Sequence, residues 1–437
     1  MESTTVAGGR GLPSLRVGTG RVNLSADDSM VVAGSILPRH VKGQEGELRA
    51  VAIVIEKPSA SKLAIVVCDV IAIVHDDVKA AVAEIEKITG IPSDNILISA
   101  THTHHAPSTI IVHGYRRDEV FCQHLREGIV RAVQQADANL SDNESYFYFH
   151  QGEENTVGGN SRLLLADGTI WWVGPRTDTV RPTGPFDPEL PVFAFRDVDG
   201  QLQALMYNHS THTIGTCNGD VRSPSFYGLT AQELEAKLGG SVCFLPGAFG
   251  STHNVTEVPP PEAVKRLKGA ITDAMERAKP MPVEELASIQ RPFTFLVRTF
   301  DEAVEDEKVS SYCRKRVPEG ADSTINVFRN MRQTLASQQG QVHETTLIAM
   351  IIGEVAIVGV PGELFTGLGV DLKERSPFQY TYIVSLANDW MGYLPDREAH
   401  ELGGYQTWMG LHSYAEEGTG ERMVDAALRM LQQLAGQ

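Results

Sequence analysis

The sequence predicts a mixed α/β fold in which β-sheets are flanked by helices, and two observations support this prediction. Short runs rich in Val and Ile, at Leu48–Ile55, Leu63–Val74 and Asn95–Ala100, are bounded by turn residues and indicate buried strands. Between the last two runs, Asp76–Thr89 has apolar residues at helical spacing and acidic residues in its first turn. The order strand, helix, strand is typical of an α/β arrangement.

The rest of the chain continues this alternation. Asp118–Ala138 carries one apolar stripe and is predicted to be a helix, and residues 144–208 contain short strands between Gly and Pro turns. Later predicted elements follow in order: helix Thr230–Leu238, strand Ser241–Leu245, helix Glu262–Ala278, strands Thr294–Arg298, Glu344–Ile352, Glu354–Val360 and Tyr380–Ala387, and helix Gly420–Ala435. Because the sequence has no internal repeat or Pro/Ser-rich linker, we predict one catalytic domain over residues 15–437. Residues 1–14 are Gly/Ser/Thr-rich, and we expect them to be flexible.

Composition excludes several classes of protein. The formal charge is 38 − 55 = −17, which repels nucleic acid phosphates, and no basic patch offsets it. The five cysteines are widely spaced without a CxxC pair, so neither a disulfide scaffold nor a thiolate zinc site is indicated. No apolar stretch approaches the roughly 20 residues of an integral membrane segment. We expect a cytoplasmic protein, or a secreted one if a signal peptide was removed, that acts on a small-molecule substrate. The oligomeric state is not indicated.

The densest candidate site follows the predicted strand at Asn95–Ala100. Ser99–Ser108 (SATHTHHAPS) holds three histidines in four positions, namely His102, His104 and His105. Residues two apart in an extended segment face the same side, so we expect His102 and His104 to point together and His105 to point away. Neutral imidazole is a good ligand for zinc, copper, iron or nickel, and strand ends are where α/β sheets place their sites. A metal or catalytic role is therefore favoured over a merely polar loop.

Two more strand exits carry candidate ligands. In MYNHSTHTIGTC, residues 206–217, His209 and His212 lie three positions apart, a spacing that a hydrogen-bonded turn would explain equally well. Zinc sites draw ligands from several elements, so this segment and the first histidine segment reinforce each other. In VGVPGELFTGLG, residues 358–369, Glu363 follows a buried strand, where it is either a site carboxylate or a helix N-terminal acid that complements the helix dipole.

A late loop, residues 385–405 (SLANDWMGYLPDREAHELGGY), is dense in Asn, Asp, Gly and Tyr. Such a loop after a strand indicates a functional segment more than a connector. Tyr393 lies in it, although a tyrosine by itself is usually a packing residue.

A glycine-rich turn follows the predicted strand Ser241–Leu245, in CFLPGAFGSTHN. We expect backbone N–H groups at Gly247 and Gly250 to stabilise an oxyanion, with Ser251 and His253 facing the same cleft. The alternative for this segment is a tight structural loop without a chemical role.

Together these segments resemble the catalytic domain of the neutral (non-lysosomal) ceramidase family, from about Val17 to Tyr405. SATHTHHAP is similar to the family segment T-H-T-H-S-G-P, YNHSTHTIG to N-x-x-x-H-x-T, and PGELFTGLG to P-G-E-F-T-T. The late loop is similar to N-x-Y-x-x-Y, and in Gly392–Tyr405 to the GYLPxREAxExGGY of shorter bacterial relatives. The resemblance implies a shorter relative that lacks the C-terminal β-sandwich domain of the true ceramidases.

Carried over residue by residue, the resemblance implies one zinc ion per chain. The implied ligands are His102, His212, Glu363 and Tyr393. It also implies that His104 lies beside the zinc-bound water. The family arginine in N-R-S is loosely matched by Arg162, which we expect to contact the substrate together with His209 and Trp172.

One family segment departs clearly from the pattern. The family's G-D-V-S-P-N supplies a serine beside the zinc, whereas this chain has GSTHN. We expect Ser251 or His253 to take that serine's place as a catalytic residue beside His104. The departure bears on the substrate more than on the metal.

The resulting functional hypothesis is a zinc-dependent amidohydrolase that cleaves a linear amide with zinc-activated water. Its substrate need not be ceramide. A second hypothesis keeps the zinc and the scaffold but takes an ester, lactone or carbohydrate, because Trp171, Trp172 and Arg176 form a polar, aromatic segment that suits sugar rings. A third is a metal-dependent binding protein without turnover.

Overall fold

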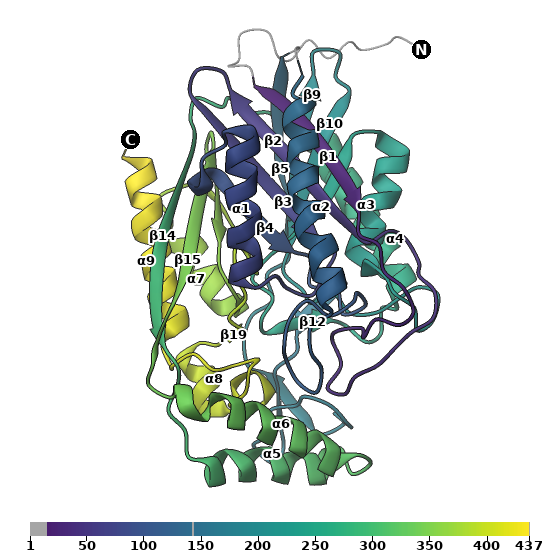
Figure 1. The fold of residues 1–437 in the computed structure, drawn as a ribbon, viewed down its shortest axis with the longest axis vertical. Coiled ribbons are helices and arrows are strands. Elements are labelled where there is room, and N and C mark those ends of the chain that lie inside the picture. The colour runs from purple at the N-terminus through teal and green to yellow at the C-terminus, as the bar shows by residue number, and fades with distance from the viewer. Residues whose placement is uncertain (1–14, 142–143, 437) are drawn as a thin grey trace.

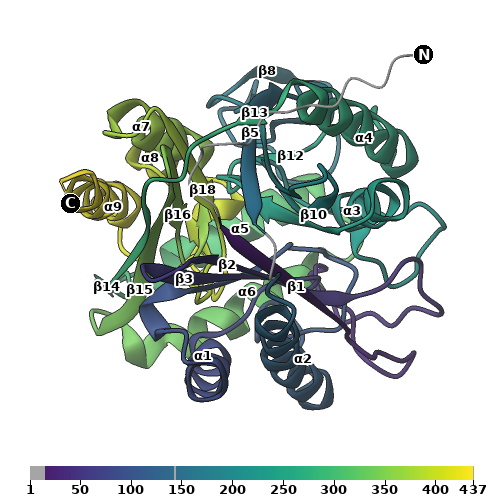
Figure 2. The ribbon, with the colours of Figure 1, turned by 90° about the horizontal axis from the view of Figure 1, so that it is seen from above.

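The computed structural model describes residues 15–141 and 144–436, so the predicted flexible segment at residues 1–14 lies outside the described residues. Three sheets surround a central core, and helices cover the outer face of each sheet (Figures 1 and 2). The predicted mixed α/β class, with mixed sheets flanked by helices, is confirmed. Within the described residues, no helix combines the length and the apolar character needed to cross a membrane.

The first sheet has the order β1-β2-β3-β4 and is covered by α1 and α2. Its elements are β1 (Arg16–Asn23), β2 (Arg49–Lys57), β3 (Ser61–Cys68), β4 (Ile96–Ala100), α1 (His75–Thr89) and α2 (Glu119–Ala138). The predicted strand Leu63–Val74 ends early, at Cys68, because the chain turns there, with the Val70 N–H donating to the Cys68 carbonyl at 2.9 Å. The apolar residues from Val70 to Ile73 are buried in the loop that follows.

The second sheet has the order β11-β10-β9-β5-β13 and packs its outer face on α3 and α4. Its elements are β5 (Ser145–Glu153), β9 (Glu189–Asp197), β10 (Leu202–His209), β11 (Ser241–Pro246), β13 (Lys279–Pro280), α3 (Ser225–Leu238) and α4 (Pro260–Arg277). Phenylalanines on its inner face, including Phe147, Phe149, Phe193 and Phe195, fill the centre of the molecule.

The third sheet has the order β14-β15-β16-β18, with α7 and α9 on its outer side. Its elements are β14 (Leu286–Leu296), β15 (Val342–Ile352), β16 (Val355–Gly359), β18 (Tyr380–Val384), α7 (Thr366–Arg375) and α9 (Thr419–Ala435). The predicted strand Thr294–Arg298 is the end of the longer β14, which pairs with β15 over its whole length. Only Leu286, Ile289 and Phe295 of β14 are buried, so its first half lacks the continuous apolar run of a buried strand.

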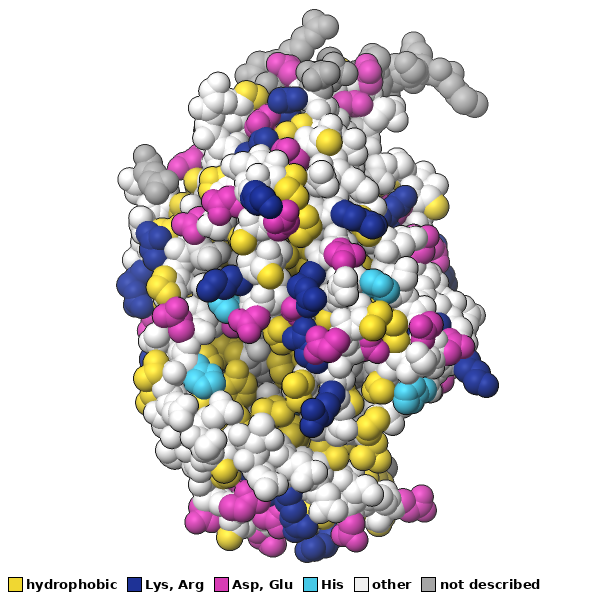
Figure 3. Space-filling view, in the orientation of Figure 1, with side chains coloured by type: hydrophobic (Ala, Val, Ile, Leu, Met, Phe, Trp, Pro, Cys, Tyr) yellow, Lys and Arg dark blue, Asp and Glu magenta, His cyan; other side chains and the backbone are white. Residues whose placement is uncertain are grey.

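Smaller elements complete the end of the molecule that lies lowest in Figure 1. They are the strand pairs β6 (Gly158–Asn160) with β12 (Thr252–Asn254), β7 (Leu163–Leu165) with β8 (Thr179–Pro182) and β17 (Glu363–Leu364) with β19 (Tyr393–Leu394), and the helices α5 (Glu302–Arg316), α6 (Ala321–Leu335) and α8 (Arg397–Leu402). Above the α5–α6 hairpin the surface is hollowed, and hydrophobic side chains gather in the hollow (Figure 3).

Each large sheet contains one parallel pair, and these pairs position the candidate site. The pairs are β3 with β4, β10 with β11, and β16 with β18. Their carboxyl ends are joined by bridges between Ser99 and Ala387 and between Thr103 and Thr213, and by the Ser385 N–H donating to the Pro246 carbonyl at 2.8 Å. Segments more than 280 residues apart in the chain therefore meet at one place.

Candidate metal centre

Side chains from four strand exits converge on one buried point. His102 and His104 follow β4, His212 follows β10, Glu363 opens β17 after β16, and Tyr393 opens β19 after β18. The side chains of the four predicted zinc ligands are almost wholly buried, with the residues between 0% and 5% exposed, whereas His104 is only partly buried. The structure thus brings together all four predicted ligands and the histidine predicted to lie beside the metal-bound water.

The donor atoms lie at the distances that a small cation requires. Glu363 Oε2 is 3.2 Å from His212 Nε2 and 3.6 Å from His102 Nε2. His212 Nε2 is 3.1 Å from the Tyr393 hydroxyl, and His102 Nε2 is 3.1 Å from His104 Nε2. Four ligands arranged tetrahedrally around zinc at about 2.0–2.1 Å lie roughly 3.3 Å from one another. The donor set of imidazoles, carboxylate and phenol therefore fits zinc.

The three imidazoles are held in the tautomer that metal ligands need. Each uses Nδ1 on a backbone carbonyl: His102 on Ile71 at 2.8 Å, His104 on Gly34 at 3.2 Å and His212 on Thr252 at 2.8 Å. Since a carbonyl can only accept, each Nδ1 carries the proton, and each Nε2 presents a lone pair. The three Nε2 atoms lie within 4.8 Å of one another. Lone pairs facing each other at these distances repel unless a cation lies between them.

Burial keeps these imidazoles neutral at neutral pH. It lowers the pKa of both His102 and His212 to about 4 and the pKa of His104 well below its usual range. Burial also raises the pKa of Glu363, whose Oε2 is buried without a hydrogen-bond partner among the described residues. An unpartnered buried carboxylate oxygen is costly in a protein interior, and a bound cation would remove that cost.

Local backbone geometry positions three of the proposed ligands. His102 adopts a left-handed conformation with φ of 61°, so the segment is not extended there as the sequence argument assumed, although His102 and His104 do point together. Such a conformation in a non-glycine residue costs free energy and clusters at functional sites. Glu363 and Tyr393 are register partners in the parallel pair β17–β19, which sets the carboxylate beside the phenol.

Two of the predicted histidines lie outside the convergent group. His105 points away, as expected, with Nδ1 at 3.0 Å from Arg39 and Nε2 accepting from the Gly215 N–H at 2.9 Å. His209, predicted to contact substrate, is fully buried, and both of its ring nitrogens are already bonded within the protein. Its Nδ1 contacts the Tyr227 hydroxyl, and its Nε2 lies 2.9 Å from the Glu154 carbonyl.

Arg162 and Trp172, also predicted to contact substrate, border the late loop instead of the convergent atoms. Arg162 is 1% exposed and donates to the carbonyls of Ala399 and Gly403 and to the side chain of Gln406. Trp172 stacks on Tyr405 with ring centroids 4.8 Å apart, so one of its faces is covered. Both side chains hold the segment that follows Tyr393.

The glycine-rich turn provides a histidine but not the predicted oxyanion amides. Gly247 donates its N–H to the His209 carbonyl at 2.8 Å, and Gly250 donates to the Leu364 carbonyl at 2.9 Å. The expectation that these two amides are available to an oxyanion is therefore wrong. Gly250 instead permits close packing, because a Cβ there would lie 2.2 Å from the Glu363 carbonyl oxygen.

Ser251 and His253, the two candidates for the missing family serine, lie in different surroundings. The Ser251 hydroxyl is hydrogen-bonded to the Thr366 hydroxyl at 3.2 Å and accepts from the Thr366 N–H at 3.1 Å. His253 packs beside His212 with ring centroids 4.1 Å apart and ring planes tilted by 41°, and its Nε2 is buried without a hydrogen-bond partner among the described residues. Only His253 has a polar atom still available beside the convergent group.

Three residues that support the site were not predicted. Trp390 donates its indole N–H to Glu363 Oε1 at 3.4 Å, and Arg39 donates to the His104 carbonyl at 2.8 Å. Gly34 accepts from His104 and has φ of 95°, and a Cβ there would lie 2.3 Å from the His104 Cβ. Trp390 lies in the late loop that the sequence marked as functional. No motif marks Gly34 or Arg39.

The three-sheet fold and its convergent strand exits define a protein of the neutral ceramidase fold type. Among solved structures, the chain is similar to the neutral ceramidase from Pseudomonas aeruginosa, with a TM-score of 0.75 and 18% identity over 97% of this chain and 75% of that chain. A structure described as ceramidase complexed with C2 gives a TM-score of 0.75 and 17% identity, over 97% of this chain and 76% of that chain. No protein-family model and no curated protein matches the sequence. The resemblance found in the sequence is thus confirmed for the fold.

Proposed function

We propose that this chain is a zinc-dependent hydrolase that cleaves the C–N bond of a linear amide. The observation that carries the proposal is the cluster of three imidazoles together with the buried Glu363 oxygen, which lies within 3.6 Å of the Nε2 atoms of His102 and His212. The ceramidase-type fold supports the same reaction class. Because the candidate ligands come from all three sheets, we also propose that residues 15–437 act as one catalytic domain, with one zinc ion per chain.

In this proposal His102, His212, Glu363 and Tyr393 hold the ion. When bound there, zinc would supply Lewis-acid chemistry, making water a nucleophile near neutral pH and drawing electron density from the amide carbonyl. His104 presents an acceptor Nε2 beside His102, because its Nδ1–H is held by the Gly34 carbonyl. This arrangement suits a residue that orients the attacking water and receives its proton.

We assign the role of the missing serine to His253. Its Nε2 is the buried polar atom that remains without a partner next to His212, whereas Ser251 is bonded to Thr366. A hydrogen bond from His253 to the substrate carbonyl would stabilise charge that develops on that oxygen. Ser251 then acts by fixing Thr366, three residues after Glu363.

The substrate is proposed to be a small molecule with an apolar portion next to its amide. The hydrophobic hollow above the α5–α6 hairpin supports an apolar portion (Figure 3). The carbohydrate alternative has less support, because the Trp172 face that would stack on a sugar ring is covered by Tyr405. Esters and lactones remain the second class of candidate substrate, because the same zinc ligands and His104 would act on their carbonyl groups.

The test combines metal analysis with a substrate panel. The purified protein should carry one zinc per chain and should hydrolyse N-acyl amides, with loss of activity in chelator and recovery on adding zinc. N-acyl amides, acyl esters and glycosides of matched size are compared under the same conditions. A protein without bound zinc, or one whose amide hydrolysis is unaffected by chelator, would refute the proposal, and a preference for esters would select the second candidate.

A further inference from the structure

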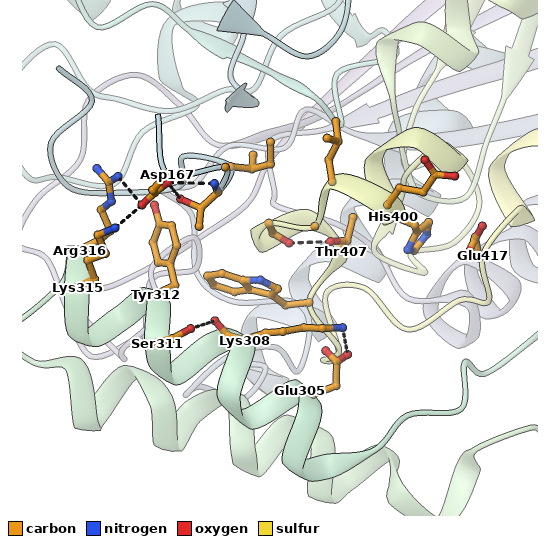
Figure 4. Close-up of a pocket in the computed structure, with 18 of the residues that line it drawn as sticks. Asp167, Glu305, Lys308, Ser311, Tyr312, Lys315, Arg316, His400, Thr407 and Glu417 are labelled. Atoms are coloured by element: carbon orange, nitrogen blue, oxygen red, sulfur yellow. Dashed lines mark hydrogen bonds and ion pairs between the residues drawn. The ribbon is translucent and has the colours of Figure 1, made fainter. Parts of the chain in front are cut away.

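A separate cavity of about 780 Å³ opens between α5, the segment that contains α8, and the turn after β7 (Figure 4). None of the proposed zinc ligands lines it. Trp408, at its wall, packs against Trp172, which stacks on Tyr405, and Tyr405 in turn contacts Tyr393 at 5.8 Å between ring centroids. Layers of aromatic rings therefore separate this cavity from the candidate metal centre.

Most charged side chains of the cavity are paired with one another. Lys308 contacts Glu305 at 2.7 Å, and Asp167 contacts both Lys315 and Arg316 (Figure 4). Each of these carboxylates already has a cationic partner. Because Arg316 also contacts Asp178 at 2.7 Å, the positive and negative charges balance in this part of the cavity.

Arg298 is the exception. Its guanidinium donates to the carbonyls of Thr407 at 2.8 Å and Ser413 at 3.3 Å, and to His400 Nδ1 at 3.0 Å. It forms no ion pair with a carboxylate of the described residues, and the nearby Glu305 is already paired with Lys308. Glu305 and Glu417 attract this half-buried guanidinium without contacting it directly, so it can still take an anion as a direct partner.

His400, beside Arg298, adds a hydrogen-bond donor to this part of the cavity. His400 accepts from Arg298 at Nδ1, so its Nε2 carries a proton that can be donated, and burial together with Arg298 lowers the pKa of His400 to about 4. The carboxylates of Glu401 and Glu417 line the exposed rim, where Glu417 has Arg397 at 3.5 Å. The positive end of the cavity therefore lies inside and the negative end at its mouth.

We propose that this cavity binds a small organic carboxylate, with its carboxyl group on Arg298 and His400. Its body lies against the apolar surface that Trp408, Tyr312 and Ile170 provide, and its other end, uncharged or cationic, faces Glu401 at the rim. The volume lies within the range of about 300–1,000 Å³ that is typical of small-molecule sites. The site is distinct from the proposed zinc centre and does not depend on it.

The probes are phenylacetate, its neutral isostere phenylacetamide and the cation phenethylamine, each titrated calorimetrically at millimolar concentrations. Phenylacetate should bind at least tenfold more tightly than phenylacetamide, with the same affinity in zinc-loaded and chelator-treated protein. Arg298→Gln should weaken phenylacetate binding by roughly tenfold to a hundredfold, as expected on losing a charge-assisted contact.

A second variant and a control keep the test decisive. His400→Phe removes the N–H donor while leaving the Arg298 bonds to the Thr407 and Ser413 carbonyls, and it should weaken phenylacetate binding several-fold even if Arg298→Gln does not fold. Arg329→Gln, on α6 and paired with Asp306 outside the cavity, should bind phenylacetate as the parent does. Equal binding of phenylacetate and phenylacetamide, preference for phenethylamine, no binding of phenylacetate, or unchanged binding in His400→Phe would overturn the proposal.

Discussion

Two neighbouring groups of buried histidines differ in a way that separates a metal site from a packed core. In the first, His102 and His212 have ring centroids 4.9 Å apart, and in the second, His113 and His412 have ring centroids 5.6 Å apart. In the second group, His113 Nε2 contacts the Tyr405 hydroxyl at 2.9 Å, and His412 Nε2 donates to the Tyr405 carbonyl at 3.0 Å. Those Nε2 atoms are satisfied by the protein.

The first group differs in the direction of its Nε2 lone pairs and in having a carboxylate beside them. Its Nδ1 atoms are held by carbonyls, its Nε2 atoms face one another, and Glu363 adds a buried carboxylate oxygen without a partner. The distances between rings are similar in the two groups, although the first has a third imidazole, His104. Second-sphere hydrogen bonds and one acid therefore define the candidate metal centre.

The largest expected effect comes from removing a ligand of the first group. His212→Ala should lose bound zinc and lower amide hydrolysis by about 10³-fold or more, beyond the roughly 10–100-fold typical of outer-sphere changes. Zinc per chain is measured by elemental analysis, and hydrolysis on the N-acyl amide panel. His113→Phe, from the second group, is the matched control and should keep one zinc per chain. Equal zinc content in His212→Ala and His113→Phe would contradict the assignment of the metal site to the first group.

The second prediction concerns Glu363, the carboxylate that the second group of histidines lacks. Glu363→Gln keeps the shape of the side chain, so zinc affinity should fall about 10²-fold through loss of charge. The metal-free protein should instead become more stable by about 1–2 kcal/mol, because the unpartnered buried charge is gone. Chelator competition measures the first quantity, and denaturant unfolding in chelator the second. A carboxylate with a purely structural role would give the opposite sign in the unfolding experiment.

The sequence predicts which segments form strands better than it predicts where each strand ends. Alternation and apolar runs reveal which segments are buried, so the order of elements and the α/β class are confirmed. The run Leu63–Val74 shows the limit, because it is buried as far as Ile73 but only residues up to Cys68 belong to the strand. Apolar character indicates burial, whereas the end of a strand depends on where the backbone turns, here between Cys68 and Val70.

For the site, the sequence locates the segments but not the orientation of each side chain. His209 and His212 leave the same strand three residues apart, yet distant residues, Tyr227 and Thr252, decide which one points to the centre. The left-handed conformation of His102 is set by the surrounding fold and leaves no local signature. Tyr393 became a candidate only through family resemblance, because its register with Glu363 is a tertiary property.

The third prediction concerns acid stability of the metal-free protein, to which both groups contribute. The folded-state pKa of His102, His113 and His212 is about 4, against an ordinary value of 6.5. Between about pH 4 and pH 6.5, these imidazoles are therefore protonated in the unfolded chain but neutral in the folded chain. The contribution of these imidazoles to the free energy of unfolding is fully present above pH 6.5. It falls as the pH decreases, by about 2 kcal/mol per imidazole between pH 7 and pH 5.

Denaturant unfolding at pH 7, 6 and 5 in chelator measures this slope. Replacing His113 by phenylalanine should remove one imidazole's share of the slope, and replacing His102 by phenylalanine should remove a similar share. Zinc should reduce the acid sensitivity only through the first group. A slope that His102→Phe and His113→Phe both leave unchanged would mean that these imidazoles are not held neutral in the folded state.

The smallest effect separates His212 from its neighbour His209, which resembles the second group in having its Nε2 bonded within the protein. Tyr227→Phe removes the hydroxyl that contacts His209 Nδ1 but keeps the ring stacked on Phe244 at 3.7 Å between centroids. We expect a loss of about 1 kcal/mol in the free energy of unfolding, the usual contribution of one hydrogen bond. Zinc content should stay at one per chain, because His209 does not face the convergent atoms. Loss of zinc in Tyr227→Phe would show that His209 belongs to the metal centre and that the tautomer argument does not separate these two histidines.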